Sequence, residues 1–305
     1  MISQIRHLVS TQGILGAMVF VAQKIFSPQF SPYKQHLHLF QGKKGIEIGG
    51  PSPVFKKGGY LPLYKDIAEL DNCNFSESTL WEGEIAKGRT FTFDKGKSAG
   101  IQYIIEATEL SAIDDNQYHF VLSSHTIEHT ANPIKALMEW KRIIGDGGTL
   151  LLIVPHYEGT FDHKRKVTTL DHLVEDFDIG TNESDTTHFK DVIETHDHRR
   201  DYQNIDLNLF EDMVNNNLST RIVHHHVFDT TLVLELVSLV GFEILHISAY
   251  RPHNILVIAR KVDSNFNFNN IEVDRLLRNH AKNLHRSPFR SDRSYLMEMK
   301  DETNR

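Results

Sequence analysis

Glycines and an acidic side chain gather at the end of the first strongly apolar segment of the chain, where they could hold a ligand. This segment, 45–49 (GIEIG), contains Glu47 and runs into Gly49, Gly50 and Pro51. Glycine allows a backbone to approach a ligand closely, and a carboxylate can accept hydrogen bonds from an amine. The pattern indicates a binding site for a ligand that carries an amine.

Later apolar segments also end in polar or small residues. These are Asp71 and Asn72 after 66–70, Ala107 and Thr108 after 101–105, and Ser124 after 118–122. Asp71 lies about 20 residues beyond the glycines, a spacing that suits an acceptor for ribose hydroxyls. Ala107 and Thr108 suit the edge of a flat purine. Neither G-x-G-x-x-G nor GxxxxGK[ST] occurs, which favours an adenosine-like ligand without phosphates.

Histidine is unusually abundant, with 19 residues. His125 and His129 follow the segment 118–122, and His163 lies beside Asp162 in FDHKR. Histidine is the usual base near neutral pH, so all three are candidate catalytic residues. Asp162 would orient His163, and Arg165 would hold an acidic or sugar-like acceptor. The competing interpretation is structural: His129 ties a loop to a helix, and FDHKR forms a local salt bridge.

Further histidines raise the question of a metal site. His224 and His226 would share one face of a strand, and Asp162 or Asp197 could complete a set of ligands for a divalent ion. His196 and His198 are also near in sequence to Asp197. The spacing matches no recognised zinc pattern. No metal ligand is therefore predicted, and a divalent metal stays an open alternative.

Alternating strands and helices must position these residues. The expected strands are 45–49, 66–70, 101–105, 118–122, 149–154, 242–247 and 254–259. Asn132 and Pro133 favour a helix start, and so does Asp229. The order predicts a Rossmann-like α/β fold, with a mainly parallel sheet and helices on both faces. Ligands of such sheets bind beyond the carboxyl ends of the strands.

Three parts of the chain are expected. Residues 1–40 form an N-terminal helical segment and linker, in which a helix at 3–26 packs on the domain rather than on a membrane surface. Its apolar run, 14–22, is too short to span a bilayer. Residues 41–261 form the main domain, and its polar insertion, 156–228, acts as a lid. Residues 262–305 form a solvated C-terminal helix and tail.

The overall charge argues against a dedicated nucleic-acid binder. The formal net charge is −7, whereas such proteins usually present a strongly basic face. A single cysteine, Cys73, excludes an intrachain disulfide and fits a reducing compartment, so a cytoplasmic location is expected.

Two stretches resemble class I S-adenosylmethionine-dependent methyltransferases of the type 11 group. GIEIGGPSP is similar to their first motif, although Pro51 replaces a further glycine. YHFVLSSHTIEHTANPIKALMEWKRIIGDGGTLLLIVP resembles their strand–helix–strand block, and GFEILHI and NILVIAR resemble their terminal hairpin. The resemblance implies a seven-stranded sheet whose last strand is antiparallel.

The resemblance also implies roles for individual residues. Glu47, Gly49 and Gly50, with Pro51, would hold the methionine part of the cofactor. Asp71, with Asn72, would take the ribose hydroxyls, and Ala107 and Thr108 would border the adenine. Ser124 and His125 would line the floor of the site.

The sequence therefore predicts an S-adenosylmethionine-dependent methyltransferase. Its expected acceptor is a small polar or sugar-like molecule, methylated on oxygen, with nitrogen left open. Two other classes stay open: a non-catalytic cofactor- or nucleotide-binding module, and a metal-dependent enzyme that uses the His-rich insertion.

Overall fold

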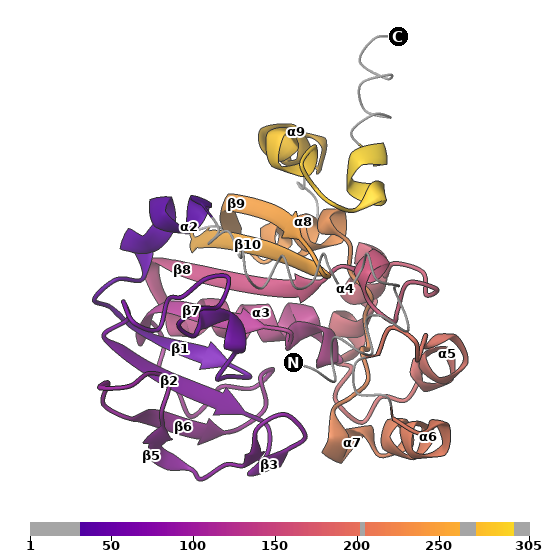
Figure 1. Cartoon of the computed structure of the whole chain (residues 1–305), viewed down its shortest axis with the longest axis horizontal. Coiled ribbons are helices and arrows are strands. Elements are labelled where there is room, and N and C mark those ends of the chain that lie inside the picture. Colours follow the sequence, from indigo (N-terminus) through magenta and orange to yellow (C-terminus); the bar gives the residue numbers. More distant parts are fainter. Residues whose placement is uncertain (1–30, 202–204, 263–272, 296–305) are drawn as a thin grey trace.

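The computed structural model describes residues 31–201, 205–262 and 273–295 (Figure 1). The helix expected at 3–26 lies outside these ranges. Within them, no helix has the length and apolar character needed to cross a bilayer.

One eight-stranded sheet runs through the molecule, in the order β5-β6-β2-β1-β7-β8-β10-β9. Its central strands β6, β2, β1, β7 and β8 are parallel, whereas β10 is antiparallel to both β8 and β9. The bounds are β1 Lys44–Ile48, β2 Glu69–Asn74, β5 Gly88–Phe91, β6 Gly100–Ile104, β7 Tyr118–Ser124, β8 Ile144–Pro155, β9 Phe242–Tyr250 and β10 Asn254–Lys261. A separate hairpin pairs β3 (Ser78–Thr79) with β4 (Gly83–Glu84).

The predicted fold class is confirmed, with two corrections to the strands. An eighth strand, β5, adds to the edge of the sheet antiparallel to β6. The second strand begins three residues later and ends four residues later than the expected 66–70. Residues 71–74 therefore lie inside the sheet, which changes the role of Asp71.

The two faces of the sheet are covered differently, because side chains alternate along each strand. In β8, Leu150, Leu152 and Val154 belong to the same core as α3 (Pro133–Ile143) and α8 (Thr230–Leu239). Leu151 and Ile153 belong to a second core with Phe40, Phe55 and Tyr64. This second face is covered by α2 (Ser31–His36) and by short 3-10 turns, Leu37–Leu39 and Pro53–Phe55. Among the described residues, the connection between β1 and β2 contains the 3-10 turn Pro53–Phe55 and no α-helix.

The helix starts follow the expected capping. The Asn132 side chain accepts a hydrogen bond from the Lys135 amide, and the Asp229 side chain accepts one from the Leu232 amide. Each bond satisfies a backbone N–H group in the first turn of a helix, which has no acceptor within the helix. Trp140 on α3 is fully buried, and its burial stabilises the fold by about 2–3 kcal/mol.

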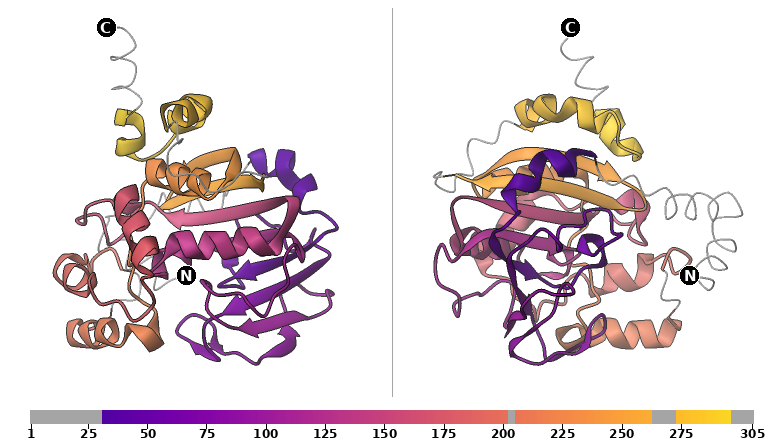
Figure 2. Two further views of the ribbon diagram at one scale, coloured as in Figure 1. Left: turned by 180° about the vertical axis from the view of Figure 1, so that it is seen from behind. Right: turned by 60° about the vertical axis from the view of Figure 1, so that its left-hand side comes forward.

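The insertion lies beyond the carboxyl ends of the parallel strands (Figures 1 and 2). It contains α4 Leu170–Ile179, α5 Phe189–Thr195, α6 Leu207–Asn215 and α7 Asn217–Thr220. A stem closes the segment 168–227 within it: the Thr168 amide donates to the Val227 carbonyl at 2.9 Å, and the Val227 amide donates to the Thr168 hydroxyl at 3.0 Å.

The C-terminal helix is not merely solvated, contrary to expectation. In α9 (Val273–Leu284), Leu277 and Leu284 are buried in the core that contains α8. Further along, Phe289 stacks on the His156 ring at 3.9 Å.

Candidate functional site

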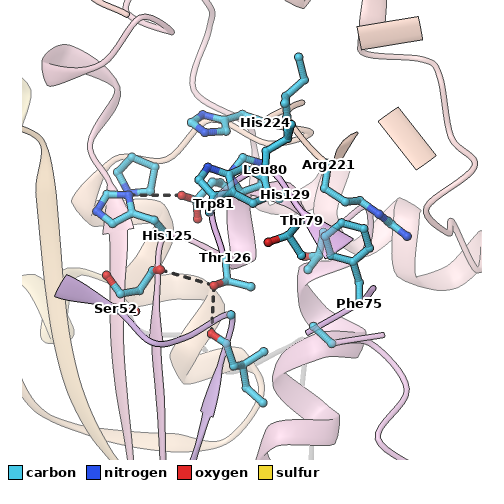
Figure 3. A pocket seen from close by; sticks show the side chains of 18 of the residues that line it. Ser52, Phe75, Thr79, Leu80, Trp81, His125, Thr126, His129, Arg221 and His224 are labelled. Atoms are coloured by element: carbon cyan, nitrogen blue, oxygen red, sulfur yellow. Dashed lines mark hydrogen bonds and ion pairs between the residues drawn. The ribbon is translucent and has the colours of Figure 1, made fainter. Parts of the chain in front are cut away.

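A cavity of about 700 Å³ lies between the strand ends and the insertion (Figure 3). Its wall on the sheet side comes from the ends of β1, β2, β6 and β7, and the opposite wall from the insertion. Among the predicted residues, those that line it are Gly49, Ala107, Ser124, His125 and His129. Its position matches the rule for ligand sites in parallel sheets.

At Gly49, where the chain leaves β1, there is no room for a residue larger than glycine. Its φ is +81°, and a Cβ there would lie 2.3 Å from the Thr126 hydroxyl oxygen. That hydroxyl donates to the Ile48 carbonyl at 3.1 Å, so the two loops are joined. The Gly49 backbone is thereby exposed to the cavity, as a close approach to a ligand requires.

Glu47 does not reach the cavity, and the predicted contact of its carboxylate with the cofactor is wrong. Its side chain is fully buried, accepting hydrogen bonds from the Ser52 amide at 2.9 Å and the Tyr64 hydroxyl at 2.6 Å. Burial raises the pKa of Glu47, although the hydrogen bonds from Ser52 and Tyr64 oppose the shift. Glu47 therefore holds the loop that follows the glycines.

Asn72, Gly50 and Pro51 also lie outside the cavity lining. The Gly50 amide donates to the Asn72 side-chain oxygen at 3.0 Å, and the Asn72 side-chain amide donates to the Gly50 carbonyl at 3.0 Å. This reciprocal pair fixes the turn from the neighbouring strand. Asn72 thus positions the glycine turn, and its expected place on the cavity is wrong.

Asp71 lies within β2, paired with Ile46, and its prediction as a ribose acceptor is wrong. It accepts hydrogen bonds from the Ile101 amide at 2.7 Å and the Tyr118 hydroxyl at 2.8 Å. The residue that stands at the end of β2 and lines the cavity is Asn74, which sequence reasoning missed. The charged Asp71 was misread as the end of the strand.

At the end of β6, Ala107 lines the cavity, whereas Thr108 is buried outside the lining. The Trp140 indole donates to the Ala107 carbonyl at 2.9 Å and so fixes this wall. Beside it, the Glu106 carboxylate pairs with Arg221 of the insertion at 2.5 Å. Arg221 also lies over the Phe75 ring, 4.9 Å from its centre, and was not predicted as a site residue.

His125 adopts a left-handed backbone with φ of 56° and is held from both sides. Its Nε2 lies 2.8 Å from the Asn254 side-chain oxygen, and its Nδ1 lies 3.4 Å from the buried Glu128 carboxylate. Burial alone would lower the pKa of His125, but the hydrogen bonds and the charge of Glu128 outweigh it and raise the pKa above the ordinary histidine value. His125 and Glu128 therefore each favour the charged form of the other.

His129 is kept neutral on the cavity wall. Burial and the neighbouring His224 lower its pKa to about 4. Its Nδ1 lies 3.1 Å from the Val223 carbonyl, so this nitrogen carries the proton and Nε2 has the lone pair. The ring also meets Trp81 of the β3–β4 hairpin, with 5.3 Å between the ring centres.

The strongest candidate for a base is His224, on the insertion side of the cavity (Figure 3). Its Nδ1 donates to the Asp162 carboxylate at 2.5 Å. Burial alone would raise the pKa of Asp162, but His224 and Arg165 lower it to about 2. A fixed carboxylate that orients one ring nitrogen leaves the other free to accept a proton.

His163, by contrast, is not part of the cavity lining. Its Nε2 pairs with Asp197 at 2.9 Å, because Asp162 is already engaged with His224. The predicted pair of Asp162 and His163 is therefore wrong. Arg165 is buried as well, bound to Asp162, to Asp191 and to the His224 carbonyl, and does not face an acceptor.

Comparison with known proteins identifies the central part of the chain. Residues 58–152 match the family model of a methyltransferase domain, which spans β2 to most of β8. No curated protein matches the chain.

Solved structures with similar folds are remote. They include an S-adenosylmethionine-dependent methyltransferase from Mesorhizobium loti (14% identity, 76% of this chain and 97% of that one, TM-score 0.44) and one from Methanosarcina mazei (16%, 75% and 97%, 0.44). A third is 1,6-didemethyltoxoflavin-N1-methyltransferase from Burkholderia thailandensis, with S-adenosylhomocysteine bound (11%, 81% and 87%, 0.41). These similarities do not indicate which substrate this chain uses. Residues 58–152 are a methyltransferase domain, which confirms the sequence prediction of a type 11-like, S-adenosylmethionine-dependent methyltransferase.

Proposed function

We propose that the protein methylates a hydroxyl group of a small polar or sugar-like acceptor, with His224 as the general base. The observation that supports this most is that one cavity combines the strand ends of a methyltransferase sheet with the Asp162–His224 pair of the insertion. The prediction of His163 as base is replaced by His224. The roles of His125 and His129 stay predictions.

The strand-end side of the cavity suits the cofactor. Gly49 brings bare backbone to the cavity, Asn74 offers an amide suited to ribose hydroxyls, and Ala107 leaves room beside the wall for a flat ring. S-adenosylmethionine would supply a methyl group on a sulfonium there. Glu47 and Asn72 act on the cofactor only through the loop that they hold.

The insertion side suits the acceptor. His224 Nε2 takes the proton that a hydroxyl loses as its oxygen accepts the methyl group, and Asp162 stabilises the imidazolium that results. Neutral His129 can accept a further hydrogen bond from the acceptor. Trp81 and Leu80, on the β3–β4 hairpin, are about half exposed at the rim and can cover an apolar face of a bound molecule.

An oxygen acceptor is favoured because an amine that is uncharged needs no base before it attacks, whereas a hydroxyl gains from one. The test is formation of S-adenosylhomocysteine with a panel of hydroxyl and amine acceptors. His224→Gln should lower turnover about 100-fold with a hydroxyl acceptor, since a positioned base contributes that much or more. The affinity for S-adenosylhomocysteine, measured by calorimetry, should stay within about twofold.

The alternative of a non-catalytic binding module is separated by the same assay. Binding of S-adenosylhomocysteine with no turnover on any acceptor would favour the module. Equal turnover of His224→Gln and the natural chain on a hydroxyl acceptor would contradict the role of His224.

A further inference from the structure

Four side chains that could bind a metal meet outside the cavity, on the insertion. They are His172 and Asp176 on α4, His188 just before α5, and His226 close to the stem. One nitrogen of each histidine and one oxygen of Asp176 all lie within 4.8 Å of one another. None of the four lines the cavity described above.

Two distances within this cluster match those between the ligands of a coordinated metal. His172 Nε2 lies 3.3 Å from His188 Nε2 and 3.4 Å from the Asp176 Oδ2 atom. Ligands bound to tetrahedral Zn²⁺ at about 2.0–2.1 Å must be about 3.3–3.4 Å apart.

Two buried polar atoms of the cluster lack a hydrogen-bond partner among the described residues. Asp176 Oδ2 is buried and has no hydrogen-bond partner among the described residues, and the same holds for His226 Nδ1. Two buried polar atoms without partners are costly unless a ligand satisfies them. The Nε2 atoms of His172 and His188 face each other, and His172 Nε2 also lies close to Asp176 Oδ2, so the three atoms converge on one point.

The surroundings resemble the support that metal ligands normally receive. The other Asp176 oxygen accepts a hydrogen bond from the Thr181 hydroxyl at 2.8 Å, which orients the carboxylate. His226 Nε2 lies 3.2 Å from the Ala131 carbonyl, so one nitrogen of this ring can donate to the backbone while the other is free. A histidine ligand usually holds its second ring nitrogen in this way.

We propose that His172, Asp176, His188 and His226 form a structural site for a divalent transition metal, zinc above all. Three imidazoles and one carboxylate complete a tetrahedral set, which leaves no position open for a substrate. The ligands come from α4, from the start of α5 and from the chain that returns to α8. The metal therefore cross-links the lid and fixes the wall that carries Arg221 and His224.

Metal content of the purified full-length protein tests the proposal. We expect about one zinc per chain, and a fall in Tm of about 5 °C or more when a chelator removes it, restored by ZnCl₂. Titration of the metal-free protein with CoCl₂ should give the intense visible absorption of a tetrahedral site. No binding of either ion would overturn the proposal.

Matched variants locate the metal. His188→Gln, at a partly exposed position, and the isosteric Asp176→Asn should each lose the zinc and the cobalt spectrum. His198→Ala, a histidine of the same insertion outside the cluster, should retain one zinc per chain. Zinc that survives both His188→Gln and Asp176→Asn, or is lost instead in His224→Gln, would contradict the site.

Discussion

Asp162 and His224, 62 positions apart in the chain, form a hydrogen bond of 2.5 Å on the wall of the cavity. Asp162 follows β8, and His224 comes near the end of the insertion. The pair therefore exists only when the insertion is folded over the strand ends. In the proposed function, this relationship makes the insertion a supplier of catalytic groups as well as a cover of the site.

Replacing Asp162 with Asn should reduce turnover about 100-fold or more, because the His224 ring loses the acceptor that fixes its tautomer. The KM for the acceptor should change far less than kcat. Steady-state kinetics measure both. Asp162 also pairs with buried Arg165, so the thermal midpoint of the variant should be recorded in parallel.

His163→Ala serves as the matched control for this change. It removes a histidine next to Asp162 that pairs with Asp197 outside the cavity lining, so most of the turnover should be retained. A loss with His163→Ala as large as that with Asp162→Asn would reinstate His163 as a catalytic residue.

Gly49→Ala should weaken binding of S-adenosylhomocysteine at least tenfold, because a Cβ would collide with Thr126 and push the turn away from its place at the cavity. Calorimetry measures the loss. Gly147→Ala is the control, since Gly147 has a similar φ of +68° but open space around it. It should cost about 1 kcal/mol of stability from backbone strain and leave the affinity unchanged.

Asp71→Ala and Asn74→Ala should have different effects, because Asp71 is buried within β2 and Asn74 lines the cavity at its end. Asp71→Ala leaves the Tyr118 hydroxyl and the Ile101 amide without their acceptor, so we expect a loss of about 2 kcal/mol in unfolding free energy. Asn74→Ala should instead weaken cofactor binding with little change in stability. Chemical denaturation and calorimetry on both variants check this, and weaker binding in Asp71→Ala at unchanged stability would restore the original prediction.

Stability should depend on pH through Glu235. Burial, together with Asp229 and Asp171, raises the pKa of Glu235 from 4.5 to about 7. Between these values the folded state holds a proton that the unfolded state has lost, so unfolding free energy falls as the pH rises from 4.5 to 7 and then levels off.

Glu235→Gln should remove most of this slope. At pH 8 the variant should be more stable than the natural chain by about 1 kcal/mol, a figure reduced for the partial solvent exposure of the group. At pH 4 the two proteins should be nearly equal. A difference that is the same at both pH values would show that Glu235 does not titrate as described.

Local signals predicted much of the fold. Asn132 with Pro133, and Asp229, marked the starts of helices through capping chemistry that acts over a few residues. The antiparallel last strand followed from the family resemblance. The end of β2 was misplaced because Asp71 is charged, and only its distant partners, Tyr118 and Ile101, explain how a carboxylate is buried there.

The site was less predictable, because its side chains come together through long-range contacts. Sequence reasoning paired Asp162 with its neighbour His163, whereas the fold brings His224 to it. In the same way, His226 was considered with His224 as a metal ligand, but the structure groups it with His172, Asp176 and His188. Histidines that are close together in the sequence thus contact different parts of the protein.

The stem formed by Thr168 and Val227 brings the two ends of the segment 168–227 to one point. Between these two residues, the length of the segment can change during evolution without displacing β8 or α8. On the proposed function, acceptor preference can therefore diverge among descendants of this chain by insertions and deletions in this one segment, while the strand ends that face the cofactor are inherited intact.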